Sequence, residues 1–270
     1  MRIRFITHGP DHPLIAATAA LLTPRHQVDV VDPALSSQPS GRVDVCLLKA
    51  RTPSALDLAQ SYEAQGAVVL NSAAATALCQ DRTEMDRLAR SAGLPFAATR
   101  TVADLARLTA EGDLPYPLVV KSRHSRRDDL VARVDDIAAL RELSRTWPHE
   151  PVVVQEFARN GGWDHKLWVI GDDVFAGLRR SELAVADTGP TLPLTEADLP
   201  DGWAELARAV GSVFALDVYG VDVVETVGGA PLIVDINAFP GMRGQTGPPR
   251  ALAALALRAG TPPGLGRPVR

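Results

Sequence analysis

The segment that most constrains the fold is residues 219–241, YGVDVVETVGGAPLIVDINAFPG. Two runs rich in β-forming residues flank a Gly-Gly pair at 228–229, which is typical of a two-residue hairpin turn. Counting outward from that turn places Asp222 directly opposite Asp235. Opposite residues share one face with Cβ atoms about 5 Å apart, and residues two apart along a strand share it too. The sequence therefore predicts that Asp222, Asp235 and Asn237 lie together on one face of a hairpin.

This set of side chains predicts a metal site. Facing carboxylates repel each other unless a cation or a proton lies between them. Mg²⁺ prefers carboxylate and amide oxygens, and it keeps water and phosphate oxygens as well. Asp222, Asp235 and Asn237 are therefore expected to bind one or two Mg²⁺ ions. The alternative interpretation is two solvated aspartates on the wet side of a hairpin.

The first part of the chain alternates strand and helix patterns, which predicts a parallel sheet with helices on both faces. The expected strands cover residues 2–7, 28–31, 43–49 and 67–70, and the expected helices cover 13–22 and 53–65. Ligands of such sheets bind beyond the carboxyl ends of the strands. His8, Lys49 and Asn71 lie at such ends.

The rest of the chain contains further helix and strand patterns, and a basic segment lies between two of the expected strands. Helices are expected over 72–79, 81–92, 135–146 and 203–214, and strands over 116–122, 130–134, 152–157, 166–170 and 174–180. Lys121 ends one strand and is followed by the basic segment SRHSRR at 122–127. A lysine and arginines in this position are suited to nucleotide phosphates. The alternative interpretation is a solvated basic loop.

Composition and missing motifs exclude several classes of protein. A formal charge of -4 with 22% charged residues gives no general signature of nucleic-acid binding. No run approaches about 18 apolar residues, so no membrane span is expected, and the first residues resemble a strand rather than a signal peptide. Cys46 and Cys79 lack metal-ligand spacing, which favours buried thiols in a reducing cytoplasm. The GxGxxG, GxSxG and GxxxxGKS/T patterns are absent.

Taken in order, the segments resemble the ATP-grasp superfamily over most of the chain. The resemblance rests on NSAAATALCQDRTEMDRLARSAGLP, PLVVK, VVVQEF and GVDVVE…LIVDIN, which follow an amino-terminal α/β region. It implies an α/β protein with α+β lobes, an ATP-grasp fold behind an N-terminal parallel-sheet α/β domain. The implied domains are residues 1–75, a central lobe over 76–154 and a carboxyl-terminal lobe over 155–270.

The resemblance also assigns nucleotide and metal roles to residues. Lys121 matches the phosphate-contacting lysine of the central lobe, and Arg82 stands where many members place a second one. Asp235 replaces the usual glutamate among the three Mg²⁺ ligands. The linker that holds adenine corresponds to Gln155, Glu156 and Phe157. ATP and Mg²⁺ are the implied cofactors.

Two branches of the superfamily are similar to the part of the sequence expected to bind the acceptor. Residues 152–183 and the segment DVCLLK, which carries Lys49, resemble inositol polyphosphate kinases. If the chain is aligned with that branch, the resemblance implies that Lys166, Arg179 and Gly241 face phosphate groups. Asn160 stands where that branch has a histidine, and its histidine-containing phosphate loop is missing.

The other branch is the RimK-like carboxylate–amine ligases. Asp164, two residues before Lys166, resembles their Asp-x-Arg element. In a ligase, Arg179 or Arg180 would hold the substrate carboxylate or the acyl phosphate. Loops around His8, His12 and Lys49 would form the acceptor pocket.

The favoured hypothesis is an amide-forming ligase that acts through an acyl phosphate on a small molecule or peptide. The alternatives are a kinase that phosphorylates a hydroxyl of an inositol phosphate or similar polyol, and a non-catalytic nucleotide-binding partner protein. Neither nucleic acid nor membrane is an expected partner, and a homodimer is possible.

Overall fold

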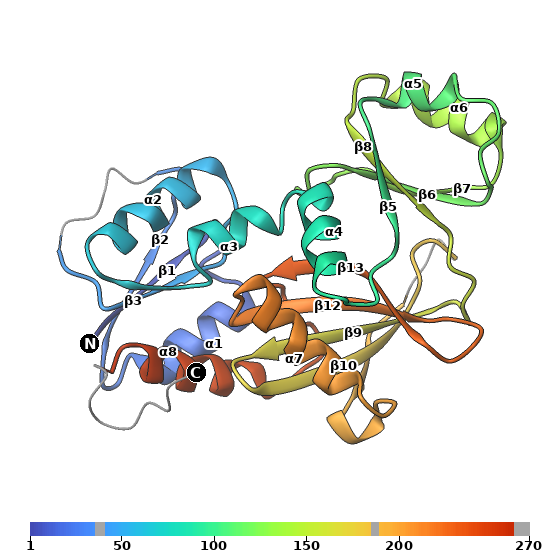
Figure 1. The fold of residues 1–270 in the computed structure, drawn as a ribbon. Coiled ribbons are helices and arrows are strands. Elements are labelled where there is room, and N and C mark those ends of the chain that lie inside the picture. The colour runs from blue at the N-terminus through green and yellow to red at the C-terminus, as the bar shows by residue number, and fades with distance from the viewer. Residues whose placement is uncertain (36–40, 185–188, 262–270) are drawn as a thin grey trace.

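The computed structural model describes residues 1–35, 41–184 and 189–261, which build three sheets (Figure 1). The first is fully parallel, in the order β2-β1-β3-β4. Its elements are β1 (Arg2–Ile6), α1 (Pro13–Leu22), β2 (Gln27–Val31), β3 (Val45–Leu48), α2 (Pro53–Ala64) and β4 (Val68–Leu70). The predicted parallel sheet is confirmed. Both cysteines are free and buried, as expected, and burial raises the pKa of each thiol to about 12.

The central lobe is an antiparallel sheet in the order β5-β8-β6-β7. Its elements are β5 (Thr99–Val102), α5 (Leu105–Thr109), β6 (Leu118–Ser122), β7 (Val131–Val134), α6 (Ile137–Thr146) and β8 (Val152–Glu156). α5 and α6 cover one side of this sheet and share a separate hydrophobic core with it, so the lobe stands apart in Figure 1. The boundary expected after residue 154 falls inside β8.

The third sheet is antiparallel, in the order β11-β10-β9-β12-β13. Its strands are β9 (Trp163–Ile170), β10 (Asp173–Arg180), β11 (Leu192–Leu194), β12 (Val218–Glu225) and β13 (Pro231–Ala238). The remaining helices are α3 (Ala73–Leu78), α4 (Arg82–Ser91), the 3-10 helix η1 (Glu196–Asp198), α7 (Trp203–Phe214) and α8 (Pro248–Ala259). Leu167, Val221 and Ile236 pack with α7 and α4 in one core. Because side chains alternate along a strand, the opposite face is free to carry polar residues.

The β12–β13 hairpin has the predicted pairing at the acids but not the predicted turn. Thr226 N donates to Ala230 O at 3.0 Å, so the loop has three residues, with Gly229 at φ 79°. That turn alone would place Val234 opposite Asp222. A bulge at Val234 inserts one residue and restores the Asp222–Asp235 pair. A slip of one residue would turn Asp235 to the other face, so the bulge is what brings the two acids together.

The last helix returns to the start of the chain. α8 packs against α1, and their side chains join Trp168 and Ile170 of β9 in one hydrophobic cluster. Sequence reasoning missed this helix, although Pro248 stands at its first turn and Gly260 at its end, as is common at helix termini. The first sheet and the third sheet therefore share a core. Within the described residues, no helix has the length and apolarity that a membrane span requires.

Asn71 connects the first sheet to the third through hydrogen bonds. Its side chain is fully buried, and its Nδ2 donates to Val218 O at 2.7 Å. Its Oδ1 accepts from the backbone N–H groups of Asp217 and Val218, each at 2.8 Å. One amide thus satisfies two backbone N–H groups at the start of β12 and shares the Val218 carbonyl oxygen with Phe239 N, which is a structural role for a residue at a strand end.

We expect Asn71→Ala to lower the free energy of unfolding by about 3 kcal/mol or more, because each buried polar group left without a partner costs about 1–3 kcal/mol. Urea denaturation followed by circular dichroism measures this loss. The control is Gln65→Ala, which removes an exposed amide bonded only to Ser61 and should change stability by less than about 0.5 kcal/mol. Equal stability of the two variants would contradict the assigned role.

Candidate active site

The open face of the third sheet carries a row of charged side chains. Cross-strand pairing aligns Gly177, Lys166, Asp222 and Asp235 across β10, β9, β12 and β13. The neighbouring row, two residues along, contains Phe175, Trp168, Gly220 and Asn237. On the other side, Arg179 pairs with Asp164. The predicted grouping of Asp222, Asp235 and Asn237 on one face agrees with this register.

Lys166 lies between two of the acids. Its Nζ is 3.0 Å from Asp222 Oδ2 and 3.8 Å from Asp164 Oδ2. Burial lowers the pKa of Lys166, but the two carboxylates outweigh burial and the net pKa is raised. Burial and the nearby charge of Asp222 raise the pKa of Asp164. The row is therefore a compact, partly dehydrated charge network.

Asp235 is held by cations from other parts of the chain. Arg82, at the start of α4, places Nη2 3.1 Å from Asp235 Oδ2 and Nη1 2.6 Å from Asp129 Oδ2. Burial alone would raise the pKa of Asp235, but Arg82 and Lys121 lower it below its usual value. Asp235 is therefore ionised at neutral pH, in a site that already attracts cations.

Lys121 links the central lobe to the hairpin. Its side chain is 5% exposed, and its Nζ donates to the Val234 carbonyl oxygen at 2.6 Å. Val234 is the bulge residue, so the irregularity that aligns the acids also supplies this acceptor. Burial lowers the pKa of Lys121, while Asp235 partly opposes that shift.

A cavity of about 150 Å³ lies between the central lobe and the third sheet. Predicted site residues form much of its wall: Lys121, Gln155, Glu156, Phe157, Asn160, Asp164, Lys166, Asp222 and Asp235. Ser181, Glu182 and apolar side chains complete it, the apolar ones being Ala97, Val119, Val131, Ala158, Leu183, Val224 and Val234. The cavity thus combines apolar walls with a cluster of charges.

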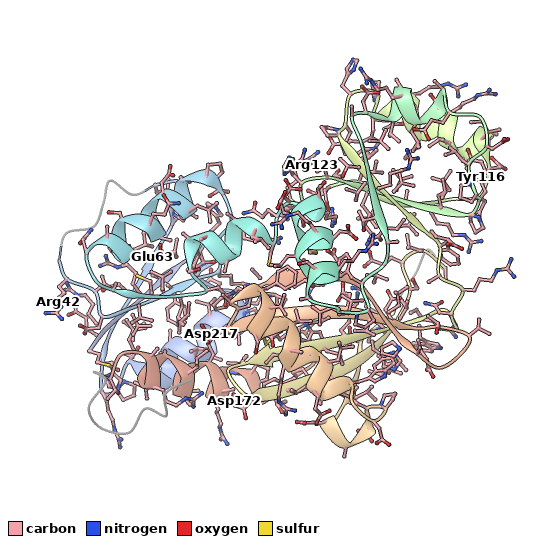
Figure 2. All side chains as sticks on the ribbon, viewed as in Figure 1. Arg42, Glu63, Tyr116, Arg123, Asp172 and Asp217 are labelled. Atoms are coloured by element: carbon pink, nitrogen blue, oxygen red, sulfur yellow. The ribbon has the colours of Figure 1, made fainter. Side chains whose placement is uncertain are left out.

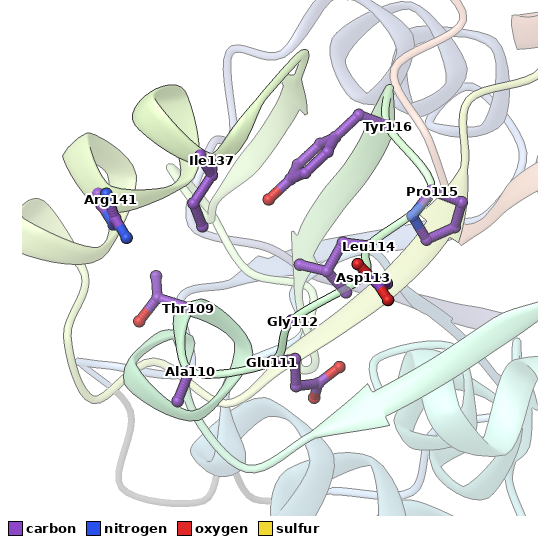
Figure 3. A pocket seen from close by; sticks show the side chains of 10 residues that line it. All are labelled: Thr109, Ala110, Glu111, Gly112, Asp113, Leu114, Pro115, Tyr116, Ile137 and Arg141. Carbon is purple, nitrogen blue, oxygen red and sulfur yellow. The ribbon is translucent and has the colours of Figure 1, made fainter.

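A second, more open hollow of about 680 Å³ lies on the central lobe. Figure 3 shows it between the segment 109–116 and the α6 residues Ile137 and Arg141. None of its lining residues belongs to the charged rows. We therefore place the candidate active site in the smaller cavity.

Arg180 is not brought to the charged face. Its guanidinium carbon lies 4.4 Å from the centre of the Trp163 ring. Alternation along β10 turns it away from Arg179, so of the two arginines predicted to hold the substrate carboxylate only Arg179 lies on the charged face. Arg179 Nη2 lies 2.7 Å from Glu182 Oε1, and Glu182 lines the cavity.

The basic segment after Lys121 is tied to acids of its surroundings. Arg123, labelled beside α4 in Figure 2, places Nη2 2.7 Å from Asp81 Oδ2. Arg126 Nη1 lies 2.7 Å from Glu150 Oε1. Neither arginine lines the cavity, so the prediction that this segment holds phosphates is not supported beyond Lys121.

The residues expected to bind the acceptor lie in three places. Lys49 and Gly241 lie at the loop after β13, where Lys49 Nζ donates to Phe239 O at 3.2 Å. His8 lies elsewhere, with Nδ1 2.8 Å from Asp32 Oδ1 and Nε2 3.2 Å from Thr52 Oγ1. Asn160 lines the cavity beside the linker.

The chemistry of the donor set fits Mg²⁺. Within the described residues, no three His, Cys, Asp or Glu side chains form a metal cluster. The candidate ligands are instead two carboxylates and an amide, Asp222, Asp235 and Asn237, whose oxygens are of the kind this ion prefers. Gly220 lies opposite Asn237, and the Pro240 and Trp168 side chains fill the space beside it, because a Cβ there would be 3.1 Å from Pro240 Cγ and 3.2 Å from Trp168 Cδ1.

A parallel-sheet domain, two lobes with antiparallel sheets and a charged cavity between those lobes define an ATP-grasp protein. The crystal structure of the RimK domain protein ATP-grasp from Sphaerobacter thermophilus DSM 20745 has this fold. It superposes with a TM-score of 0.74 at 25% identity, covering 95% of this chain and 100% of that one. The chain belongs to the RimK-like ATP-grasp family, whose domain matches residues 95–248.

Two relatives extend the comparison. Probable alpha-L-glutamate ligase 2 of Hahella chejuensis is 26% identical over 198 residues, which are 68% of this chain and 63% of that protein. Ribosomal protein bS6--L-glutamate ligase of Escherichia fergusonii is 25% identical over 202 residues, 68% and 64% of the two chains. The match therefore spans slightly under two thirds of the length of these relatives.

Proposed function

We propose that this protein is an ATP-dependent carboxylate–amine ligase that acts through an acyl phosphate. The observation that carries the proposal is the cavity that joins the Gln155–Phe157 linker to Lys121, Asp222 and Asp235. Family membership supports ATP as the phosphoryl donor. The ligase names of the two relatives favour amide formation over hydroxyl phosphorylation.

The apolar part of the cavity suits the adenine base. Phe157 lies there, and its ring is covered on one side by the Arg133 guanidinium at 4.2 Å. Gln155 donates its side-chain amide to Thr99 Oγ1 at 2.9 Å. This contact holds the linker in place and leaves base recognition to the backbone.

The charged part of the cavity suits the phosphates. Asp222 and Asp235 from the cavity wall, with Asn237 from the neighbouring row outside the lining, would hold Mg²⁺, which neutralises phosphate charge when bound. Lys121 and Arg82 are placed to orient the γ-phosphoryl group, so catalysis rests on alignment and electrostatics. Sharing Asp235 with a metal would weaken its pairing with Arg82 and release that guanidinium toward phosphate.

The reaction has two steps. A substrate carboxylate oxygen attacks the γ-phosphorus, the bond to the bridging oxygen breaks, and ADP leaves. The amine then attacks the acyl carbon, loses a proton and expels inorganic phosphate. Arg179 is the residue on the charged face suited to hold the carboxylate. Lys166 stands between this region and the metal ligands.

We expect purified protein with ATP and Mg²⁺ to release ADP and phosphate only when both a carboxylate and an amine are present. L-Glutamate is the first amine substrate to test, because both relatives are named for it, and one of them names a protein as the other substrate. Hydroxylamine should trap the acyl phosphate as a hydroxamate. EDTA should abolish the reaction, and excess Mg²⁺ should restore it.

Phosphorus NMR of the products separates the alternatives. A stable phosphate ester would show a kinase instead. Tight ATP binding without turnover across acceptor panels would identify a non-catalytic nucleotide-binding protein.

A further inference from the structure

Four basic side chains gather where the first sheet meets the loop after β13. Lys49 and Arg51 follow β3, His12 precedes α1, and Arg243 lies in the loop itself. Lys49 lies close enough to Arg51, and His12 to Lys49 and Arg243, for each pair to repel electrostatically. The charged side chains that shift the pKa of Lys49 and of His12 are cations of this cluster.

Lys49 and Arg51, which are half-buried, lack the acidic partners that other cations of low exposure have. Arg4 pairs with Asp29 and Lys166 with Asp222. Among the described residues, Lys49 and Arg51 form no ion pair, and neither does the exposed Arg243. Within the described part of the chain, the contacts of Lys49 Nζ are the Phe239 and Pro240 carbonyl oxygens, at 3.2 and 3.4 Å, and the face of the Phe239 ring.

Arg51 contributes an unpaired donor to the cluster. Among the described residues, its Nη1 is buried and has no hydrogen-bond partner. A buried guanidinium nitrogen without an acceptor is unfavourable by more than a neutral donor would be. Burial and the charge of Arg51 also lower the pKa of Lys49 to about 8. A bound anion would relieve both conditions.

The backbone of the loop is shaped to form this cluster. Phe239 and Met242 adopt left-handed φ angles of 47° and 49°, although neither is glycine. Such residues cost about 1–3 kcal/mol each and are common at ligand sites. Gly241 lies against His12, because a Cβ there would be 3.4 Å from His12 Nε2. His12 Nδ1 accepts from Leu14 N and is thereby oriented.

The cluster adjoins the charged rows. Phe239 is two residues past Asn237 and four past Asp235, and Pro240 packs beside Gly220 in the neighbouring row. The cluster therefore lies next to the row that contains Asn237, on the side of the first sheet.

We propose that Lys49 and Arg51, with His12 and Arg243 beside them, bind an anionic oxygen group, carboxylate or phosphate, on the acceptor and remote from its reacting group. This inference rests on the proposed function, and it makes the acceptor an acid with a second anionic group. Charge-assisted hydrogen bonds from a lysine and an arginine are the contacts that such a group prefers.

Equilibrium binding tests the site without turnover. Glutarate and inorganic phosphate are titrated separately by calorimetry into the protein saturated with Mg²⁺ and ADP. Lys49→Met and Arg51→Met should each weaken binding of the preferred probe by about 10- to 100-fold, the loss of one charge-assisted hydrogen bond. Arg42→Met removes an exposed cation of the same domain and should leave the affinity unchanged. Binding unaltered in both Lys49→Met and Arg51→Met, or no binding of either probe by the wild type, overturns the inference.

A kinetic test compares acceptors that differ only in one anionic group. Dipeptides with a free carboxyl terminus are compared with their amides, and O-phosphoserine with serine. The wild type should prefer the acid at least about tenfold, and both variants should lose that preference while the KM for ATP stays within about twofold. Probe binding that depends on Lys49 and Arg51 in a protein without turnover would refute the proposed function and keep this site. Turnover by a wild-type protein that shows no preference for the acid would refute this site and keep the proposed function.

Discussion

Asp235→Asn is expected to reduce acceptor-dependent ADP formation by about 10³-fold. A metal ion supplies several kcal/mol of charge stabilisation to phosphoryl transfer, and each 1.36 kcal/mol is about tenfold in rate. Asp235 is the candidate ligand closest to both cations of the site, Arg82 and Lys121. Coupled measurement of ADP release at saturating Mg²⁺, and again across a Mg²⁺ titration, separates weaker metal binding from slower chemistry.

The same substitution should also lower stability. Removing the carboxylate leaves Arg82 and Lys121 buried with less compensation, and breaking a buried ion pair costs about 3–5 kcal/mol. Asn237→Ala is the matched variant, because Asn237 makes no ion pair, so activity should fall with an unfolding free energy within about 1 kcal/mol of the wild type. If the two single variants Asn237→Ala and Asp235→Asn both keep full activity, the assignment of these residues as metal ligands is wrong.

Lys121→Met is expected to lower activity far more than stability. Loss of one preorganised electrostatic donor in a site of this kind costs about 10²–10³-fold in rate. The substitution also removes the donor to the Val234 carbonyl oxygen, while Asp235 keeps its ion pair with Arg82, so we expect the free energy of unfolding to fall by about 1–3 kcal/mol. We therefore expect kcat/KM for ATP to fall by about 10²–10³-fold, with a modest decrease in the thermal midpoint.

Steady-state kinetics and differential scanning calorimetry on the same preparation check both halves of this expectation. Arg127→Met is the control, since Arg127 is almost fully exposed in the neighbouring basic segment and should leave both quantities unchanged. A Lys121→Met protein that unfolds readily would show that the lysine has a structural role, and one with normal kcat/KM would show that it does not contact ATP.

Local pattern was sufficient for much of the fold. The bounds expected for the helices 13–22 and 203–214 are those of α1 and α7, because apolar spacing and terminal residues are local features. The Asp222–Asp235 pair was also predicted, although for an incomplete reason. A two-residue turn and a three-residue turn followed by a bulge give the same register at the acids, and the sequence does not distinguish them.

Contacts between distant segments were beyond such reasoning. Arg82 reaches Asp129, 47 residues away, and Asp235, 153 residues away. Arg51 is two residues past Lys49, but the sequence does not show that its Nη1 is buried without a hydrogen-bond partner among the described residues. That depends on how distant segments pack around it. The choice between Arg179 and Arg180 depends on which face of β10 is covered by α7, and alternation alone leaves that open.

The separate core of the central lobe bears on how a nucleotide enters. The first and third sheets share one hydrophobic cluster, whereas the cluster beneath β5–β8 takes no side chain from either of them. Rotation of the central lobe as a rigid body would therefore leave every buried core intact and would stretch mainly polar ties, such as Lys121 to Val234. Lys121 is also the lysine proposed to orient the γ-phosphoryl group, so nucleotide binding and lobe closure would share this contact.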